Sequence, residues 1–352
     1  MDKIWWEKTE NARKFLSAAT GILAGGRSVV LCLPERLPWR ETMRDVLRKL
    51  LRENFSGTTY EIEAVDAGEK PQKYVMNNFC ENKSGFRPYG DEPYAKFLAA
   101  SEDISLNTAC LWIQDANDAQ ADAWFKFMDD YHKFLADKIG GVFLLESGAN
   151  FSKRSVNGVE ILSYDRTIGD YDSFAFNILL ASEFCNDNDL MKQYLAELVT
   201  QLVGNDVELG AACVKRSEDF LRNPREVFKE ILITENFSST KSEKDIEFAI
   251  WLTQMKLIFP LVEIFRHKLI KNYHANISDA LPCNSSYGER VEIPEQVELG
   301  TLMFLVNSGR LRFDKFDWDE LISYRYVRNS LAHLKTLAFD DLQKVFDKNS
   351  RR

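Results

Sequence analysis

The chain has 352 residues, of which 45% are hydrophobic and 28% charged, a composition typical of packed globular domains rather than of a disordered chain. The apolar runs at 28–33 and 141–145 are too short to cross a bilayer, and the N-terminus lacks the basic start and apolar stretch of a signal peptide. We therefore expect a cytoplasmic protein without a membrane partner.

The formal net charge of −9 is unevenly distributed. Residues 241–352 hold 17 basic and 16 acidic residues, which leaves 28 basic and 38 acidic residues in 1–240. The acidic part argues against broad nucleic-acid affinity there, because such binding depends on neutralising phosphates with Lys and Arg. The remaining part can meet a phosphate backbone only through local patches.

The first half alternates predicted helices with apolar strands. We predict helices at about 5–24, 40–53 and 118–138 and strands at 28–33, 58–65, 108–113, 141–145 and 159–164. Gly25-Gly26 ends the first helix, and 68–95 has the Gly, Pro and Asn content of an irregular insertion. This alternation predicts an α/β domain over 1–172, with a mostly parallel sheet and flanking helices.

Strand signals vanish after residue 172. Residues 173–234 read as several helices in a lid-like region, and the polar segment 235–244 reads as a linker. Further helices are predicted at about 245–272, 295–307, 317–334 and 338–348. The fold class is thus α/β plus all-α, ending in a helical bundle over 245–352.

A strand, a loop, a helix and a later strand ending in Asp115 form the layout of a nucleotide-binding domain. Over roughly 1–234 the chain resembles AAA+/STAND-type P-loop ATPases in this order of elements, which implies a nucleotide at the loop after Leu33. That loop needs GxxxxGK[ST], whose amides, lysine and hydroxyl hold the phosphates and magnesium. The sequence instead reads Pro34-Glu35-Arg36-Leu37-Pro38-Trp39-Arg40-Glu41. We therefore expect a degenerate module with little or no ATP hydrolysis.

Two residues of this region keep a charge that suits a nucleotide site. Arg40 falls at the lysine position and Asp115 at the position of a magnesium-binding carboxylate. The alternatives stay open: Asp115 or Asn117 suits the N-cap of the next helix, and Arg36, Arg40 and Arg44 can form a solvated face.

The segment from Tyr324 to Leu334 contains Arg-Asn-x-x-Ala-His. Here the chain, over about 245–345, resembles the HEPN superfamily, helical domains that include many metal-independent endoribonucleases. Their signature is an Arg and a following His with four to six residues between them, often with a polar residue just after the Arg. Arg328 and His333 have four residues between them, and Asn329 holds the polar position. The resemblance implies catalytic roles for these three residues, RNA as substrate and a homodimer with the site at its two-fold interface.

The residue types suit RNA transesterification independently of the resemblance. A histidine exchanges a proton near pH 7, and an arginine stabilises charge that develops on a phosphate. The alternative is structural: Arg328, Asn329 and His333 can pin their helix to the long one through Glu263 or Arg266. Arg325 and Lys335 flank the motif as candidate phosphate contacts or plain surface charges.

Metal and disulfide chemistry find little support. None of the six cysteines forms a CxxC pair, so buried free thiols are expected, and none of the four histidines has an HExxH-like partner. We expect no metal and no cofactor. The leading hypothesis is a HEPN-like endoribonuclease controlled by a degenerate ATPase-like sensor with a protein partner, in prokaryotic defence or a toxin system. The alternative is a non-catalytic adaptor in a larger complex.

Overall fold

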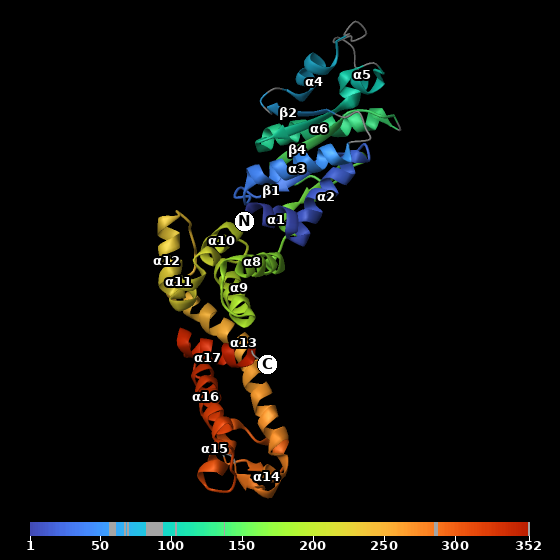
Figure 1. Cartoon of the computed structure of the whole chain (residues 1–352). Helices are drawn as coiled ribbons and strands as arrows, with labels where there is room; N and C mark the ends of the chain where they lie inside the picture. Colours follow the sequence, from blue (N-terminus) through green and yellow to red (C-terminus); the bar gives the residue numbers. More distant parts are fainter. Residues whose placement is uncertain are drawn as a thin grey trace. The chain divides into compact units, whose positions relative to one another are not determined.

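The chain folds into two compact units, Met1–Asp172 and Ser173–Arg352 (Figure 1). The computed structural model describes residues 1–55, 61–66, 68, 70–81, 94–102, 104–136, 138–284 and 288–350. The first unit is α/β and the second is almost entirely helical, so the expected α/β plus helical layout is confirmed.

A five-stranded parallel sheet organises the N-terminal unit. Its order is β2-β3-β4-β1-β5. The strands are β1 (Ser28–Leu33), β2 (Glu61–Asp66), β3 (Ala109–Gln114), β4 (Val142–Gly148) and β5 (Val159–Ser163). Strands β1, β3 and β4 are buried along almost their whole length, as expected where helices cover both faces of a parallel sheet. All five strands were predicted, although residues 58–60 of the predicted second strand lie outside the described part.

Helices of the N-terminal unit lie on the two faces of this sheet. They are α1 (Asp2–Lys8), α2 (Glu10–Ala24), α3 (Arg40–Asn54), α4 (Pro71–Phe79), α5 (Tyr94–Ala100), the 3-10 turn η1 (Ser105–Thr108), α6 (Asp118–Leu135) and α7 (Tyr164–Thr167). Apolar side chains of β1, β3 and β4 pack with α4, α5 and α6 in one core cluster. Helix α2 packs on β1, β4 and β5 and also against α3, so α2 and α3 cover the other face.

Two predicted features of this unit were wrong. The single helix expected at 5–24 is divided into α1 and α2, because Thr9 has an extended backbone (φ −73°, ψ 125°). The stretch 68–95 was expected to be irregular, yet it contains α4. Pro71 begins that helix, and Val75 and Phe79 bury its apolar side, so a proline taken as a breaker serves as a helix start. Residues 82–93 lie outside the described part.

The C-terminal unit is built around one long helix. After α8 (Asp170–Phe184) come α9 (Asp189–Val203), α10 (Val207–Lys215), α11 (Ser217–Arg222), α12 (Pro224–Thr234), α13 (Glu243–Asn272), α14 (His274–Asp279), β6 (Cys283–Asn284), β7 (Arg290–Val291), η2 (Pro294–Gln296), α15 (Leu299–Asn307), α16 (Lys315–Ala332) and α17 (Phe339–Ser350). Helix α13 packs against α9, α12 and α16, so the lid-like and bundle segments share one unit.

Helix α13 is also long and apolar enough, by length and composition, to cross a membrane. The apolar runs considered in the sequence missed it, because charged and polar residues interrupt its 30 residues. Core helices of soluble proteins can meet the same criterion; in α13 39% of the apolar window is buried, and the helix packs on α9, α12 and α16. Lys256 in the middle of the helix also forms an ion pair with Glu197 of α9 at 2.5 Å.

The cysteines behave as expected from their spacing. All six are buried free thiols, so this prediction is confirmed. Burial raises the pKa of the Cys110 thiol to about 12. Within the described ranges, no three His, Cys, Asp or Glu side chains lie together in a way that would hold a metal ion.

A buried histidine joins α6 to the sheet. His132 Nε2 lies 2.7 Å from the Ser28 hydroxyl, which accepts a hydrogen bond from the Phe143 amide at 3.0 Å. Gly158 lies against the imidazole, since a Cβ there would come within 2.5 Å of His132 Cγ. Burial lowers the pKa of His132 to about 4, so the ring is neutral at physiological pH and shares one hydrogen bond with the Ser28 hydroxyl.

This burial gives the N-terminal unit a specific pH dependence. The unfolded chain takes up a proton on His132 below about pH 6.5, whereas the folded chain does so only near pH 4. The contribution to stability is therefore complete above pH 6.5 and is lost as the pH falls toward 4, by about 1 kcal/mol at pH 5.5. Urea unfolding at pH 7.0 and 5.5 should show a smaller pH effect in His132→Gln than in wild type. His267→Gln, which removes an exposed histidine, should keep the wild-type effect; an unchanged pH effect in His132→Gln would contradict this account.

Candidate functional site

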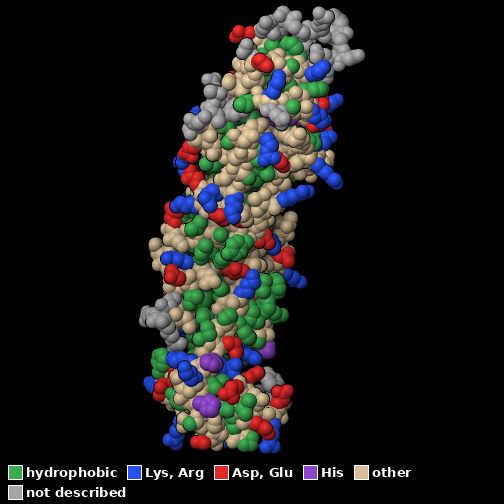
Figure 2. All heavy atoms as spheres, turned by 90° about the vertical axis from the view of Figure 1, so that its right-hand side faces the viewer, with side chains coloured by type: hydrophobic (Ala, Val, Ile, Leu, Met, Phe, Trp, Pro, Cys, Tyr) green, Lys and Arg blue, Asp and Glu red, His purple; other side chains and the backbone are tan. Residues whose placement is uncertain are grey.

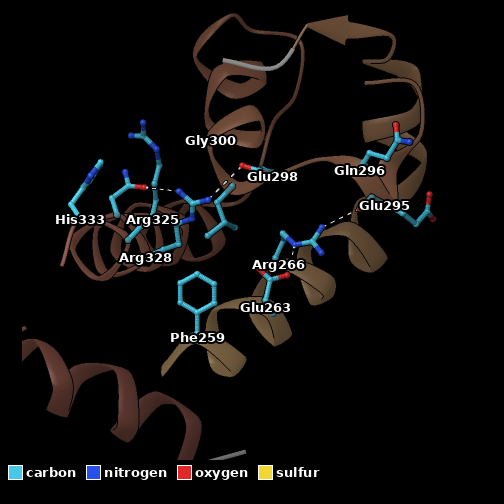
Figure 3. A pocket seen from close by; sticks show the side chains of 13 residues that line it. Phe259, Glu263, Arg266, Glu295, Gln296, Glu298, Gly300, Arg325, Arg328 and His333 are labelled. Atoms are coloured by element: carbon cyan, nitrogen blue, oxygen red, sulfur yellow. Dashed lines mark hydrogen bonds and ion pairs between the residues drawn. The ribbon is translucent and has the colours of Figure 1, made fainter. Parts of the chain in front are cut away.

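A cavity of about 500 Å³ opens in the C-terminal unit beside the end of α16 (Figure 3). Side chains from α13, α15, α16 and the segment around η2 line it. They are Phe259, Glu263, Arg266, Glu295, Gln296, Glu298, Leu299, Gly300, Arg325, Arg328, Asn329, Ala332 and His333. The three residues that the sequence singled out as catalytic therefore face one common space.

Packing against α13 fixes the position of α16. The rings of Phe265 and Tyr324 stack with their centroids 4.3 Å apart. Trp251 Nε1 donates to the Leu331 carbonyl at 2.8 Å, and Gln254 bonds both backbone groups of Leu337. The Trp251 bond holds the last turn of α16 through its backbone, and the Gln254 bonds hold the segment that follows the helix.

Helix α16 ends at His333 in a Schellman arrangement. The Lys335 amide donates to the Ser330 carbonyl at 2.9 Å, and the Leu334 amide donates to Leu331 at 3.1 Å. Leu334 takes the left-handed position with φ 58°, where glycine is usual, at a cost of about 1–2 kcal/mol. The result is an exposed His333 whose imidazole bonds none of the described side chains.

Arg328 is held only weakly. One of its nitrogens donates to Asn329 Oδ1 at 3.4 Å, and another lies 3.8 Å from a Glu298 carboxylate oxygen (Figure 3). The Arg328 side chain is 35% exposed and that of Glu298 is 62% exposed, so solvent screens their ion pair. A phosphate entering the cavity can displace this contact at small cost.

The other charges of the cavity nearly balance. Arg266 donates to Glu263 at 2.8 Å and to the carbonyls of Glu295 and Val297, whereas Arg325 donates to the sulfur of Met303 at 3.1 Å and pairs with no carboxylate of the described residues. Figure 2 shows Lys/Arg, Asp/Glu and His side chains intermixed at the α14–α15 end of this unit on the face it presents. Arg325 and Arg328 are thus the cavity arginines without a strong carboxylate partner among the described residues.

Some residues of this cavity are neighbours in the sequence and others come from distant segments. Arg328, Asn329 and His333 lie at one helix end, and the sequence analysis named all three as candidates. The alternative of a pin through Glu263 or Arg266 is not what is observed, because those two side chains bond each other. Glu298 was missed, since its approach to Arg328 depends on how α15 packs on α16.

The nucleotide-site candidates of the N-terminal unit lie together around a buried carboxylate. Glu146 of β4 is 2% exposed. Arg44 donates to its two oxygens at 3.0 and 2.7 Å, Trp112 Nε1 donates at 3.0 Å, and Arg40 lies at 3.3 Å. Arg44 also bonds Asp115 at 2.7 Å. Glu146 raises the pKa of Arg44 further above its ordinary value.

The backbone around this cluster is unusual at two positions. Trp39, the N-cap of α3, has φ 44°, and Asp115 has φ 52°, both in the left-handed region. Asn117, not Asp115, caps α6 through a reciprocal pair with Gln120. Asp115 is therefore free of a capping role, and its carboxylate is engaged by Arg44.

This cluster occupies the place where a phosphate-binding loop would act. Both Arg40 and Arg44 are directed to Glu146, and Arg40 also donates to the Pro34 carbonyl at 3.3 Å. An incoming phosphate would have to replace a buried carboxylate that is already neutralised. Arg40 and Arg44 are therefore both engaged by Glu146 and are not available to a nucleotide at this loop.

Removing the charge of Glu146 should lower the free energy of unfolding of the N-terminal unit. Glu146→Gln leaves the buried Arg44 guanidinium without its main partner, which costs about 3–5 kcal/mol. Glu160→Gln is the matched control, because the Glu160–Arg27 pair is exposed and is worth less than about 1 kcal/mol. Urea unfolding followed by tryptophan fluorescence measures both. Equal losses in the two variants would show that the cluster does not stabilise the unit.

Comparison with known proteins adds no family to this geometry. No protein-family model matches the chain, and no curated protein matches it. The choice of candidate residues therefore rests on the motif, the order of elements and the contacts described above.

Proposed function

We propose that the C-terminal unit is a metal-independent endoribonuclease of the HEPN-like kind. The observation that carries the proposal is that Arg328, Asn329 and His333 line one open cavity, with the imidazole of His333 exposed and unbonded to the described side chains. A catalytic acid or base needs an accessible nitrogen, and an arginine that binds a phosphate needs to be released easily from its resting contacts. Both conditions hold here.

The reaction that suits these groups is transesterification within the RNA chain. The 2′-oxygen attacks the adjacent phosphorus, the bond to the 5′-oxygen breaks, and a 2′,3′-cyclic phosphate and a free 5′-hydroxyl result. His333 takes the 2′-hydroxyl proton, and Arg328 stabilises the negative charge on the phosphate oxygens. The proton for the leaving 5′-oxygen comes from a second imidazole or from water, so atoms and charge balance without a metal.

A second copy of the chain would supply that second imidazole. The HEPN resemblance implies a homodimer in which the two sites face each other, and two exposed His333 rings would then meet at the two-fold axis. His333 lies at the very end of α16, a position open to a partner chain. The homodimer is part of the proposal.

The N-terminal unit is proposed to act as a degenerate ATPase-like sensor in prokaryotic defence or a toxin system. Its Arg40, Arg44 and Asp115 side chains are engaged in one ion-pair cluster with Glu146, which supports the expectation of little or no ATP hydrolysis. A sensor of this kind would control the nuclease by binding a protein partner. The proposed function places the protein in the cytoplasm without a membrane partner.

A non-catalytic adaptor is the second candidate function. The observation that favours it is the presence of Glu263, Glu295 and Glu298 in the wall of the same cavity, since carboxylates repel an RNA backbone. In that case the cavity would accept a protein side chain or a small cation-bearing group, and the purified chain would not cut RNA.

Substitution of the motif histidine tests the proposal directly. His333→Ala and, separately, Arg328→Ala should lower the rate of RNA cleavage by about a hundredfold or more, because each removes a group from the transition state. His267→Ala removes an exposed histidine outside the cavity and should cut at the wild-type rate. The measurement is cleavage of a labelled single-stranded RNA in parallel reactions with and without EDTA.

Each outcome of that assay decides between the two functions. Cleavage that persists in His333→Ala would reject the site, and cleavage that disappears with EDTA would reject the metal-independent mechanism. If the wild-type chain cleaves no RNA, either as a monomer or as a dimer, the nuclease proposal is rejected and the adaptor function is favoured.

The carboxylate opposite Arg328 should weaken RNA binding in the wild-type chain. Glu298→Gln removes that charge, so we expect the Kd for RNA to fall about two- to fivefold at low salt and the difference to shrink as salt rises. Glu292→Gln removes an equal charge that pairs with Arg290 outside the cavity and should leave the Kd near the wild-type value. If both substitutions lowered the Kd equally, the effect of Glu298 would come from net charge alone and not from its place opposite Arg328.

A further inference from the structure

A second cavity, of about 510 Å³, lies in the N-terminal unit at the carboxyl ends of β1, β4 and β5. Its wall includes the last residues of β1 and β5, the segment after β4, and α7. The lining residues are Cys32, Ala149, Phe151, Ser152, Lys153, Arg154, Ser155, Ile161, Ser163 and Arg166. Ligands of open parallel sheets bind outside the carboxyl ends of the strands, and this cavity lies at that end of β1 and its neighbours β4 and β5.

The charge of this cavity is entirely positive. Lys153, Arg154 and Arg166 line it, and none of the described lining residues is an Asp or Glu. Lys153 pairs with an exposed Asp122 at 3.4 Å, whereas no described carboxylate pairs with Arg154 or Arg166. All three cationic residues are exposed to solvent, so an anion can reach them, and they form a positive patch in a part of the chain that is otherwise acidic.

The thiol at the bottom of the cavity does not cancel this charge. Burial raises the pKa of Cys32 to about 11, although the nearby Arg166 lowers it somewhat. The side chain is therefore a neutral thiol at physiological pH, and the cations keep their full effect. The wall offers hydroxyl groups as well, from Ser152 and Ser163.

The rest of the wall is ordered and partly apolar. Ser155 Oγ accepts a hydrogen bond from the Ile161 amide at 3.0 Å, which ties the segment after β4 to β5. Phe151 packs edge-on against Phe125 of α6, with ring centroids 5.5 Å apart. Phe151 and Ile161 therefore give the wall an ordered apolar part, and the volume is in the range of small-molecule sites.

From these features we propose that the cavity binds a small organic phosphate, with Arg154 and Arg166 on the phosphate and Phe151 and Ile161 against the organic part. Arginine forks match the geometry of phosphate oxygens, and serine hydroxyls add donors. The site is separate from the Glu146 cluster, none of whose members lines it. The inference is also independent of the proposed RNA cleavage.

Thermal unfolding and calorimetry of the full chain test the site. The probes are pyrophosphate, AMP, ATP and adenosine. We expect AMP or ATP to raise Tm and to bind more tightly than pyrophosphate, and we expect adenosine to have no effect. The double variant Arg154→Gln/Arg166→Gln should weaken the Kd at least about tenfold, and higher salt should weaken wild-type binding.

Arg27→Gln is the matched control. Arg27 lies just before the amino end of β1, whereas the cavity lies at the carboxyl ends of the strands, and it pairs with Glu160. It should bind like wild type. The proposal is overturned if no phosphate compound binds at millimolar concentration, or if the double variant binds as tightly as Arg27→Gln. Binding of pyrophosphate as tight as that of AMP and ATP would reject the apolar half of the site. Because Arg154→Gln/Arg166→Gln leaves Arg328 and His333 in place, only binding that this double variant loses counts for the N-terminal cavity, and that result is independent of whether the C-terminal unit is a nuclease.

Discussion

The buried carboxylate of Glu146 is the constraint on which the N-terminal unit depends. A carboxylate removed from water is costly unless several donors surround it, and here Arg44, Arg40 and Trp112 do so. Helix α3 is thereby tied to β3 and β4 across the carboxyl edge of the sheet. The same arrangement commits the two arginines nearest the loop after β1, so the fold is stabilised by the charges that a phosphate would otherwise need.

In the C-terminal unit the arginine of the motif has no such strong carboxylate partner among the described residues. Arg328 has only a 3.4 Å contact to Asn329 and a 3.8 Å contact to an exposed Glu298. The helix that carries it is instead held by a ring stack and by the Trp251 bond to a backbone carbonyl. The groups that stabilise the helix are thus not the groups that would bind RNA. Arg328 is therefore available to a phosphate, and this is the physical reason for proposing the chemistry in this unit.

Sequence reasoning succeeded where the controlling interaction is local or simply apolar. The buried strands follow from short apolar runs, and the cap of α6 is Asn117, one of the two residues that the sequence offered for it. It failed where partners are distant: Arg44 and Glu146 are 102 residues apart, and the side of α4 that is buried depends on its neighbours. The glutamate facing Arg328 and the cationic cavity after β4 likewise need the folded chain before they can be recognised.

Strand β1 divides the carboxyl edge of the sheet into two electrostatically different halves. On the side of β3, Glu146 and Asp115 neutralise Arg40 and Arg44. Toward β5, Lys153, Arg154 and Arg166 surround a hollow without a carboxylate among its described lining residues. An anion would therefore be drawn to the β5 side, where ordering Arg154 and Arg166 costs no existing ion pair. A ligand there would contact the segment after β4 and α7 rather than α3, so a sensor role would operate through those elements and leave the Glu146 cluster intact.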